Sequence, residues 1–180
     1  IIHSKMPAMK EGKLLGFQLW INMPAKSKMN KPEYLYIKNN QLGVHKDNEK
    51  IVKVIAGKFE NAEGPEKGHN VDPIYFHVVL EKDKEFKCDV PNKHNSFIYL
   101  LAGDLSVGEN THDKTCNSNL ILLDRGNKLI VKANKKSEFL FIAGKPIGEP
   151  IARGGPFVMN TKAEILQAVQ DYHNGTFAKY

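Results

Sequence analysis

Short apolar segments alternate with polar turns along most of this chain, and the pattern predicts β-strands. Residues 74–80 place Ile74, Phe76, Val78 and Leu80 at every second position, which is typical of a strand with one buried face. Similar segments recur at short intervals. The predicted strands are 15–22, 34–37, 51–56, 74–80, 86–90, 97–101, 105–107, 120–123, 129–133 and 139–143. Strands this short and evenly spaced indicate a small antiparallel sandwich or barrel, so we expect an all-β fold.

Polar residues, glycine and proline predict the connections between these strands. Residues 39–50 and 61–72 have loop composition, and Ala102-Gly103-Asp104 is typical of a tight turn. Residues 134–138 separate two apolar segments, so we expect Lys135 and Lys136 at a hairpin tip.

The C-terminal part combines an irregular segment with a helix. Residues 142–161 are rich in glycine and proline and predict an irregular crossing. Thr161 is followed three residues later by Glu164, the capping-box spacing that starts a helix. We expect this helix to cover about 161–173 and to end at Asn174-Gly175 with a left-handed cap.

Two motifs resemble those of the pirin family of bicupin proteins. Residues 143–172 read A-G-x-P-x-x-E-P-I-x-x-x-G-P-F-V-M-N-T-x-x-E-I-x-x-A-x-x-D-Y, similar to that family's C-terminal signature. Residues 16–24, G-F-Q-L-W-I-N-M-P, resemble the segment where the family passes from its first barrel to its second. The resemblance covers nearly the whole chain but only part of the two-barrel family protein.

The resemblance implies a cupin-type antiparallel β-barrel, or jelly roll, with a short C-terminal helix. It predicts that residues 1–14 are a remnant of the first cupin barrel and that 15–31 form the inter-barrel strand and linker. Residues 32–180 would be the pirin C-terminal cupin domain. Because the chain begins with Ile1, we expect a fragment or a processed product. A lone second barrel would expose apolar surface, including Trp20.

The histidines give no metal site in the second barrel. The seven histidines include no His-x-His pair, and the resemblance implies that the second barrel has lost its metal. The opening I-I-H-S-K-M-P resembles a family segment that supplies an iron-ligating histidine and glutamate. His3 would then be one ligand of an incomplete Fe(II) site, and Lys5 stands where the family has glutamate. A frayed terminal histidine without a role is the alternative. A lysine ammonium offers no lone pair, so Lys5 should weaken iron binding.

Other candidate residues have structural interpretations. We expect His77 to be a partnered strand histidine and His112-Asp113 to be a loop dipeptide without a nucleophile. Asp104 and Glu149 are candidates to pair with Arg153 at the surface. Two widely spaced cysteines, Cys88 and Cys116, predict free thiols rather than a disulfide framework.

Charge and hydropathy restrict the classes of partner. The net charge of +6 comes almost wholly from scattered lysines, which indicates a solvated surface and no direct reading of DNA. No segment approaches the length of a membrane span. We expect an intracellular protein, in the cytoplasm, the nucleus or both.

Two classes of function follow from the resemblance. Pirins are similar to quercetin 2,3-dioxygenases, in which Fe(II) binds a flavonol and activates dioxygen. They also act as iron-dependent nuclear coregulators that bind transcription factors. The chain alone lacks a complete metal site, so we expect no catalytic residues in it and no dioxygenase activity from it. The alternative is a non-enzymatic protein-binding or vestigial single-barrel fragment.

Overall fold

The computed structural model describes residues 11–12, 16–66, 70–108, 115–116 and 120–177 of the 180-residue chain. It divides into two compact units. The larger unit covers residues 35–146, and the smaller one combines residues 1–34 with 147–180. We describe each by itself.

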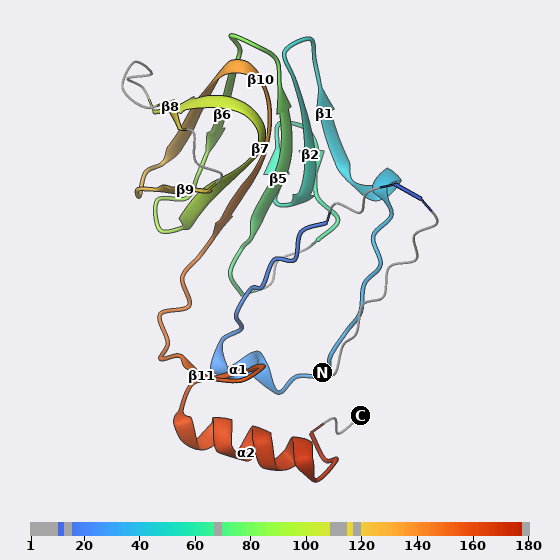
Figure 1. The fold of residues 1–180 in the computed structure, drawn as a ribbon, viewed down its shortest axis with the longest axis vertical. Coiled ribbons are helices and arrows are strands. Elements are labelled where there is room, and N and C mark those ends of the chain that lie inside the picture. Colours follow the sequence, from blue (N-terminus) through green and yellow to red (C-terminus); the bar gives the residue numbers. More distant parts are fainter. Residues whose placement is uncertain (1–10, 13–15, 67–69, 109–114, 117–119, 178–180) are drawn as a thin grey trace. The chain divides into compact units, whose positions relative to one another are not determined.

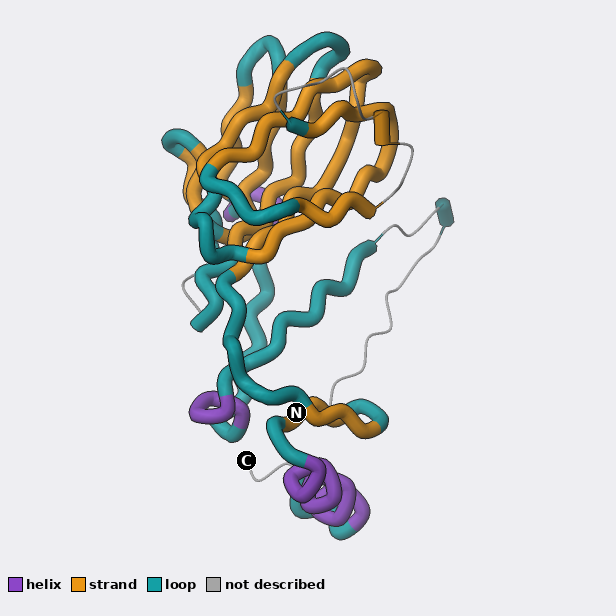
Figure 2. Tube along the Cα trace, turned by 90° about the vertical axis from the view of Figure 1, so that its left-hand side faces the viewer, coloured by secondary structure: helices purple, strands orange, loops and turns teal. Residues whose placement is uncertain are grey.

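One antiparallel sheet forms most of the larger unit. Its strand order is β1-β2-β5-β10-β7-β8, with β6 also pairing with β10 and β9 with β7. The strands are β1 Gly43–Lys46, β2 Lys50–Ala56, β5 Ile74–Leu80, β6 Glu85–Asp89, β7 Asn95–Val107, β8 Thr115–Cys116, β9 Leu120–Leu123 and β10 Lys128–Gly144. A short 3-10 helix, η1 Asn39–Gln41, precedes β1, and a hairpin of β3 Lys58–Phe59 and β4 Ala62–Glu63 follows β2. The long strands β7 and β10 curve strongly, and the sheet rolls around a common interior (Figures 1 and 2).

Aromatic side chains fill this interior. In β5, Phe76, Val78 and Leu80 are buried while the alternate residues are half-buried, so the predicted period-two pattern is confirmed. The rings of Phe59 and Phe86 stack with centroids 5.2 Å apart, and Phe86 meets Phe139 edge-to-face at 5.7 Å. The all-β prediction is therefore confirmed, with the core inside the curved sheet.

Two predicted turns are wrong, because β7 and β10 each run through the segment concerned. Residues 102–104 lie within β7, and 134–138, with Lys135 and Lys136, lie within β10. The two segments face each other, and the pairing register shifts there. Gly103 has a φ of +99°, and Ser137 Oγ accepts a hydrogen bond from Asp104 N at 3.0 Å. A matched irregularity thus accommodates the polar residues without ending either strand.

Both predicted loops contain regular structure. Residues 39–50 include η1 and β1, and β1 pairs with β2. Residues 61–72 include β4 and bury Ala62 and Val71. In 61–72 the average composition conceals the two buried apolar residues. In 39–50 the strand depends on its pairing with β2, which local composition does not report.

The strands predicted at 15–22 and 34–37 are absent from the described residues. Residues 16–24 and 31–38 form no strand, and the Trp20 side chain is 67% exposed. Alternation favours an extended backbone, but a strand also needs a hydrogen-bonding partner. In the described part of the chain, no strand pairs with either segment.

The smaller unit contains two helices and a hairpin. They are α1 Ala25–Lys28, β11 Ala152–Gly154, β12 Phe157–Met159 and α2 Lys162–His173. The hairpin corrects the prediction of an irregular crossing over all of 142–161. Helix α2 begins at the predicted Thr161–Glu164 capping box, and Gly175 follows its end with a φ of +71°. The predicted helix and its left-handed termination are therefore confirmed. Among the described residues, no helix is long and apolar enough to cross a membrane.

Candidate functional site

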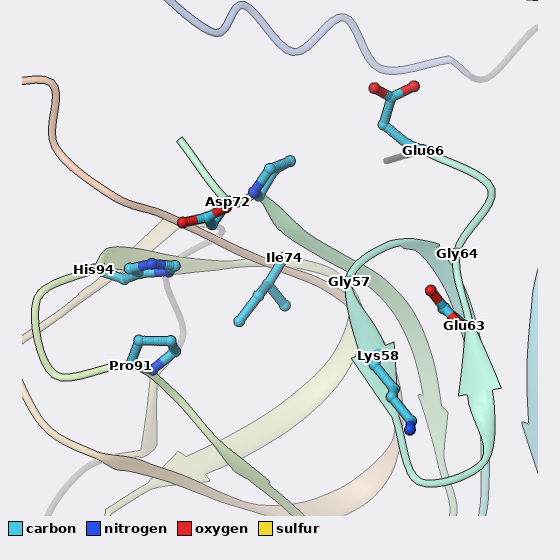
Figure 3. Close-up of a pocket in the computed structure, with 10 residues that line it drawn as sticks. Gly57, Lys58, Glu63, Gly64, Glu66, Asp72, Ile74, Pro91 and His94 are labelled. Carbon is cyan, nitrogen blue, oxygen red and sulfur yellow. The ribbon is translucent and has the colours of Figure 1, made fainter. Parts of the chain in front are cut away.

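The larger unit has a hollow of about 520 Å³. Residues from four segments line it, namely 57–58, 63–66, 72–74 and 91–94. These segments are the β3–β4 hairpin region, the start of β5 and the loop before β7. Figure 3 shows Asp72, His94 and Pro91 grouped at one side of the hollow, Lys58 and Glu63 at the other, and Ile74 between them. We call this hollow the His94 pocket. Its volume lies within the usual range for small-molecule sites.

Close backbone approach explains two glycines in the wall of the His94 pocket. Gly57 has a φ of +83°, a conformation that favours glycine. A Cβ on Gly64 would lie 2.5 Å from the carbonyl oxygen of Ile55. Gly64 N also donates a hydrogen bond to Gly57 O at 2.9 Å. The two glycines thus bring the hairpin region against the end of β2 and shape one wall.

His94 is the chemically unusual residue of the pocket. Its backbone N–H donates to Pro91 O at 2.8 Å, which fixes a tight turn, and the residue is only 6% exposed. Its Nδ1 is buried and has no hydrogen-bond partner among the described residues. A buried polar atom without a partner costs about 1–3 kcal/mol. Such an atom is a candidate contact for a ligand or an ordered water.

Burial lowers the pKa of His94. The negative charge of Asp72 opposes this effect, while the positive charge of Lys145 reinforces it. The imidazole is therefore neutral near pH 7, with one nitrogen that donates and one that accepts.

Charged and apolar groups share the lining. Three carboxylates, those of Glu63, Glu66 and Asp72, and one ammonium, that of Lys58, lie around it. Pro73, Ile74 and Pro91 supply apolar surface. The arrangement suits a small organic molecule that makes both polar and apolar contacts.

The described residues do not fit the iron that the family resemblance implies. Among them, no group of three or more His, Cys, Asp or Glu residues is placed to hold a metal ion. His3 and Lys5 lie outside the described residues, so their part in a metal site stays a prediction.

Three of the other candidate residues have structural partners. His77 Nε2 lies 2.6 Å from Glu138 Oε1, which confirms a partnered strand histidine. Glu149 accepts hydrogen bonds from Ala25 N at 2.7 Å and Asn160 Nδ2 at 2.9 Å. In the described part of the chain Glu149 has no ion pair with Arg153. The predicted pairing with Arg153 is therefore wrong for Glu149. The side chain of Asp104, in the larger unit, accepts a hydrogen bond from Asn134 Nδ2 at 3.2 Å, and its pairing with Arg153 stays a prediction. His112 and Asp113 lie outside the described residues.

Cys88 is a free thiol, as predicted. Burial, with a smaller effect from Asp89, raises its pKa to about 12. The thiol stays protonated at neutral pH and is therefore a poor nucleophile. Nothing is described of the Cys116 side chain.

The sequence did not predict His94 as a residue of the site. In the sequence it follows Pro91, Asn92 and Lys93, which reads as an exposed turn. Its burial results from packing against residues distant in the chain, and no local pattern reports that. The only feature of the sequence that could have pointed to His94 is its position next to a proline-containing turn.

The rolled antiparallel sheet and the closing helix define a cupin protein. The Pirin C-terminal cupin domain matches residues 75–178, which is more than half of the chain. The chain belongs to the pirin family.

Relatives extend this similarity beyond the matched domain. A pirin-like protein of Caulobacter vibrioides is 37% identical over 98% of this chain. A Vibrio cholerae protein provisionally named a quercetin 2,3-dioxygenase is 34% identical over all of it. The crystal structure of a quercetin 2,3-dioxygenase from Acinetobacter baumannii superposes with a TM-score of 0.78 at 30% identity. The superposition covers 88% of this chain and 55% of the Acinetobacter baumannii chain. The chain spans 64% of the length of the two curated relatives.

Proposed function

We propose that this chain is the second-barrel part of a pirin-type quercetin 2,3-dioxygenase. The observation that carries the proposal is the similarity in sequence and fold to the quercetin 2,3-dioxygenase of Acinetobacter baumannii. The proposed organisation is a first-barrel remnant at 1–14, an inter-barrel linker at 15–31 and the C-terminal cupin domain at 32–180. The substrate class is a flavonol.

The proposed cofactor is Fe(II), with His3 as one ligand. When bound in such a site, iron supplies the activation of dioxygen. The described residues offer no metal-holding group. By the family resemblance, the proposal takes the remaining ligands from sequence upstream of the second barrel. Lys5 adds a positive charge two residues from His3, and this charge opposes cation binding. In this proposal, the role of the C-terminal cupin domain is structural, as a packed barrel.

Lys5 supplies the test of this metal site. We expect Lys5→Glu, introduced into the native protein, to raise the iron bound per molecule, because a carboxylate is a ligand and an ammonium is not. Atomic absorption after dialysis against a known free-iron concentration measures it. Lys10→Glu makes the same charge change close by in sequence and is the matched control. Equal iron contents in the native protein and both variants would contradict the proposed role of this position.

A second candidate function is protein binding in the nucleus or cytoplasm, without catalysis. The observation in its favour is the exposure of large apolar side chains in 19–23, namely Leu19, Trp20, Ile21 and Met23. The proposed partner is a transcription factor. Isothermal titration with a purified Rel-type factor tests this candidate, and we expect Trp20→Ser to weaken the interaction at least tenfold. Leu122→Ser, at another exposed apolar residue, should leave it unchanged. Equal affinity in both variants would contradict binding through this segment.

A further inference from the structure

We infer that the His94 pocket binds a small neutral ring compound with two adjacent hydroxyl groups. This inference goes beyond the proposed dioxygenase chemistry, because it needs neither iron nor dioxygen. It rests on the buried, unpartnered Nδ1 of His94 and on the groups that surround it.

Hydroxyl groups match the polar lining. Carboxylates such as that of Asp72 only accept hydrogen bonds, and the ammonium of Lys58 only donates them. His94 Nδ1 donates or accepts according to its tautomer. A hydroxyl group both donates and accepts hydrogen bonds, so it can bond to a carboxylate, to the ammonium or to the imidazole nitrogen. A ligand hydroxyl on Nδ1 would remove the cost of leaving that atom unpaired.

Charge favours a neutral ligand over an anionic one. The described lining residues carry three carboxylates and one lysine. Lys145 adds a second positive charge near His94, and a neutral imidazole adds none. An anion entering the pocket would meet this excess of negative charge. The unpartnered imidazole nitrogen of His94 also offers a neutral contact that a hydroxyl group fills without desolvating a charge.

The apolar lining favours a ring. Ile74 lies between the two polar ends of the pocket in Figure 3, and Pro91 lies beside His94. A flat or nearly flat ring can pack on these side chains while its hydroxyl groups reach the polar atoms. Adjacent hydroxyls would let one ring contact His94 and Asp72 together.

The binding test uses two diols on the full 180-residue chain. Catechol carries the hydroxyls on an aromatic ring, and 1,2-cyclohexanediol carries them on a saturated ring. We expect at least one to bind in the millimolar range, with NMR shift changes at His94 and Ile74 and a nuclear Overhauser effect to the Ile74 methyl groups. Benzoate, an anion of similar size, should bind at least tenfold more weakly. The stronger of the two diols identifies a phenolic or a sugar-like ligand.

Variants of the pocket lining and a control outside it locate the binding. We expect His94→Phe, which has no ring nitrogen, to weaken binding of the preferred diol at least tenfold. His94→Asn should retain affinity within about threefold, since an amide atom takes the place of Nδ1. His77→Asn lies outside the pocket lining and should change nothing. Should His94→Phe fail to fold, Lys58→Met, at an exposed residue, should still weaken binding several-fold.

Three outcomes would overturn the inference. One is the absence of shifts at His94 and Ile74 with both diols. Another is equal affinity in the native chain and His94→Phe. The third is a crystal soaked with the diols in which an ordered water alone occupies the position beside Nδ1.

Discussion

Thr161 and Glu164 form reciprocal hydrogen bonds at the start of α2. Glu164 Oε2 accepts hydrogen bonds from Thr161 N at 2.7 Å and from its hydroxyl at 2.9 Å, while Glu164 N donates to Thr161 Oγ1 at 3.2 Å. These reciprocal bonds satisfy amide groups that a helix start otherwise leaves unpaired. The pKa of Glu164 is lowered chiefly by the bond from the Thr161 hydroxyl.

Thr161→Ala should loosen α2. Loss of a threonine cap costs about 1 kcal/mol, so amide hydrogens in the first two turns should exchange about fivefold faster. Hydrogen exchange followed by NMR measures this. Lys162→Ala, at the next residue, keeps the cap and should leave the rates unchanged. Unaltered exchange in Thr161→Ala would show that packing, rather than the cap, holds the helix start.

Phe86→Ala should strongly destabilise the larger unit. Phe86 is fully buried between Phe59 and Phe139, and its removal leaves a cavity in the interior of the sheet. The free energy of unfolding should fall by about 3–5 kcal/mol, measured by urea titration of the far-ultraviolet circular dichroism. Leu122→Ala, at a residue 78% exposed, should change it by less than about 0.5 kcal/mol. Similar losses in both variants would contradict the placement of the core.

Gly64→Ala should be destabilising although alanine is small. The new Cβ would lie 2.5 Å from Ile55 O, so the backbone of the pocket wall must shift. We expect a loss of about 1–3 kcal/mol in urea titrations. Gly126→Ala is the control, since its Cβ would meet nothing nearer than Lys128 O at 4.0 Å. A neutral effect of Gly64→Ala would mean that the wall is less tightly packed than described.

Acidification should destabilise the larger unit through His94. Burial lowers its folded pKa below the ordinary value of about 6.5, so the unfolded chain binds this proton first as the pH falls. The stability contribution is intact above pH 6.5, declines as the pH drops from there to the folded pKa, and is then lost. NMR titration of the imidazole should give a pKa below 6.5. His94→Asn should remove this part of the pH dependence of urea unfolding. If stability depends on pH in the same way in the native protein and in His94→Asn, the assignment of this effect to His94 is contradicted.

Sequence alone predicted what depends on local periodicity. The buried face of β5 and the capped helix α2 both follow from residue spacing. The continuity of β7 and β10 did not, because it depends on the hydrogen bond between Asp104 and Ser137, two residues far apart in the chain. The alternation in 15–22 suggested a strand, but strand formation depends on a pairing strand that local sequence does not report. His94 was missed for the same reason, since its burial arises from tertiary packing.

The most direct test of the proposed function is quercetin-dependent oxygen consumption by the native protein isolated from its natural source. The proposal predicts one dioxygen consumed per quercetin cleaved, activity lost on iron chelation and restored by Fe(II), and an intact mass above the 20.3 kDa of this chain. A homogeneous protein that contains iron but consumes no oxygen with quercetin would contradict it. That result would favour the protein-binding function.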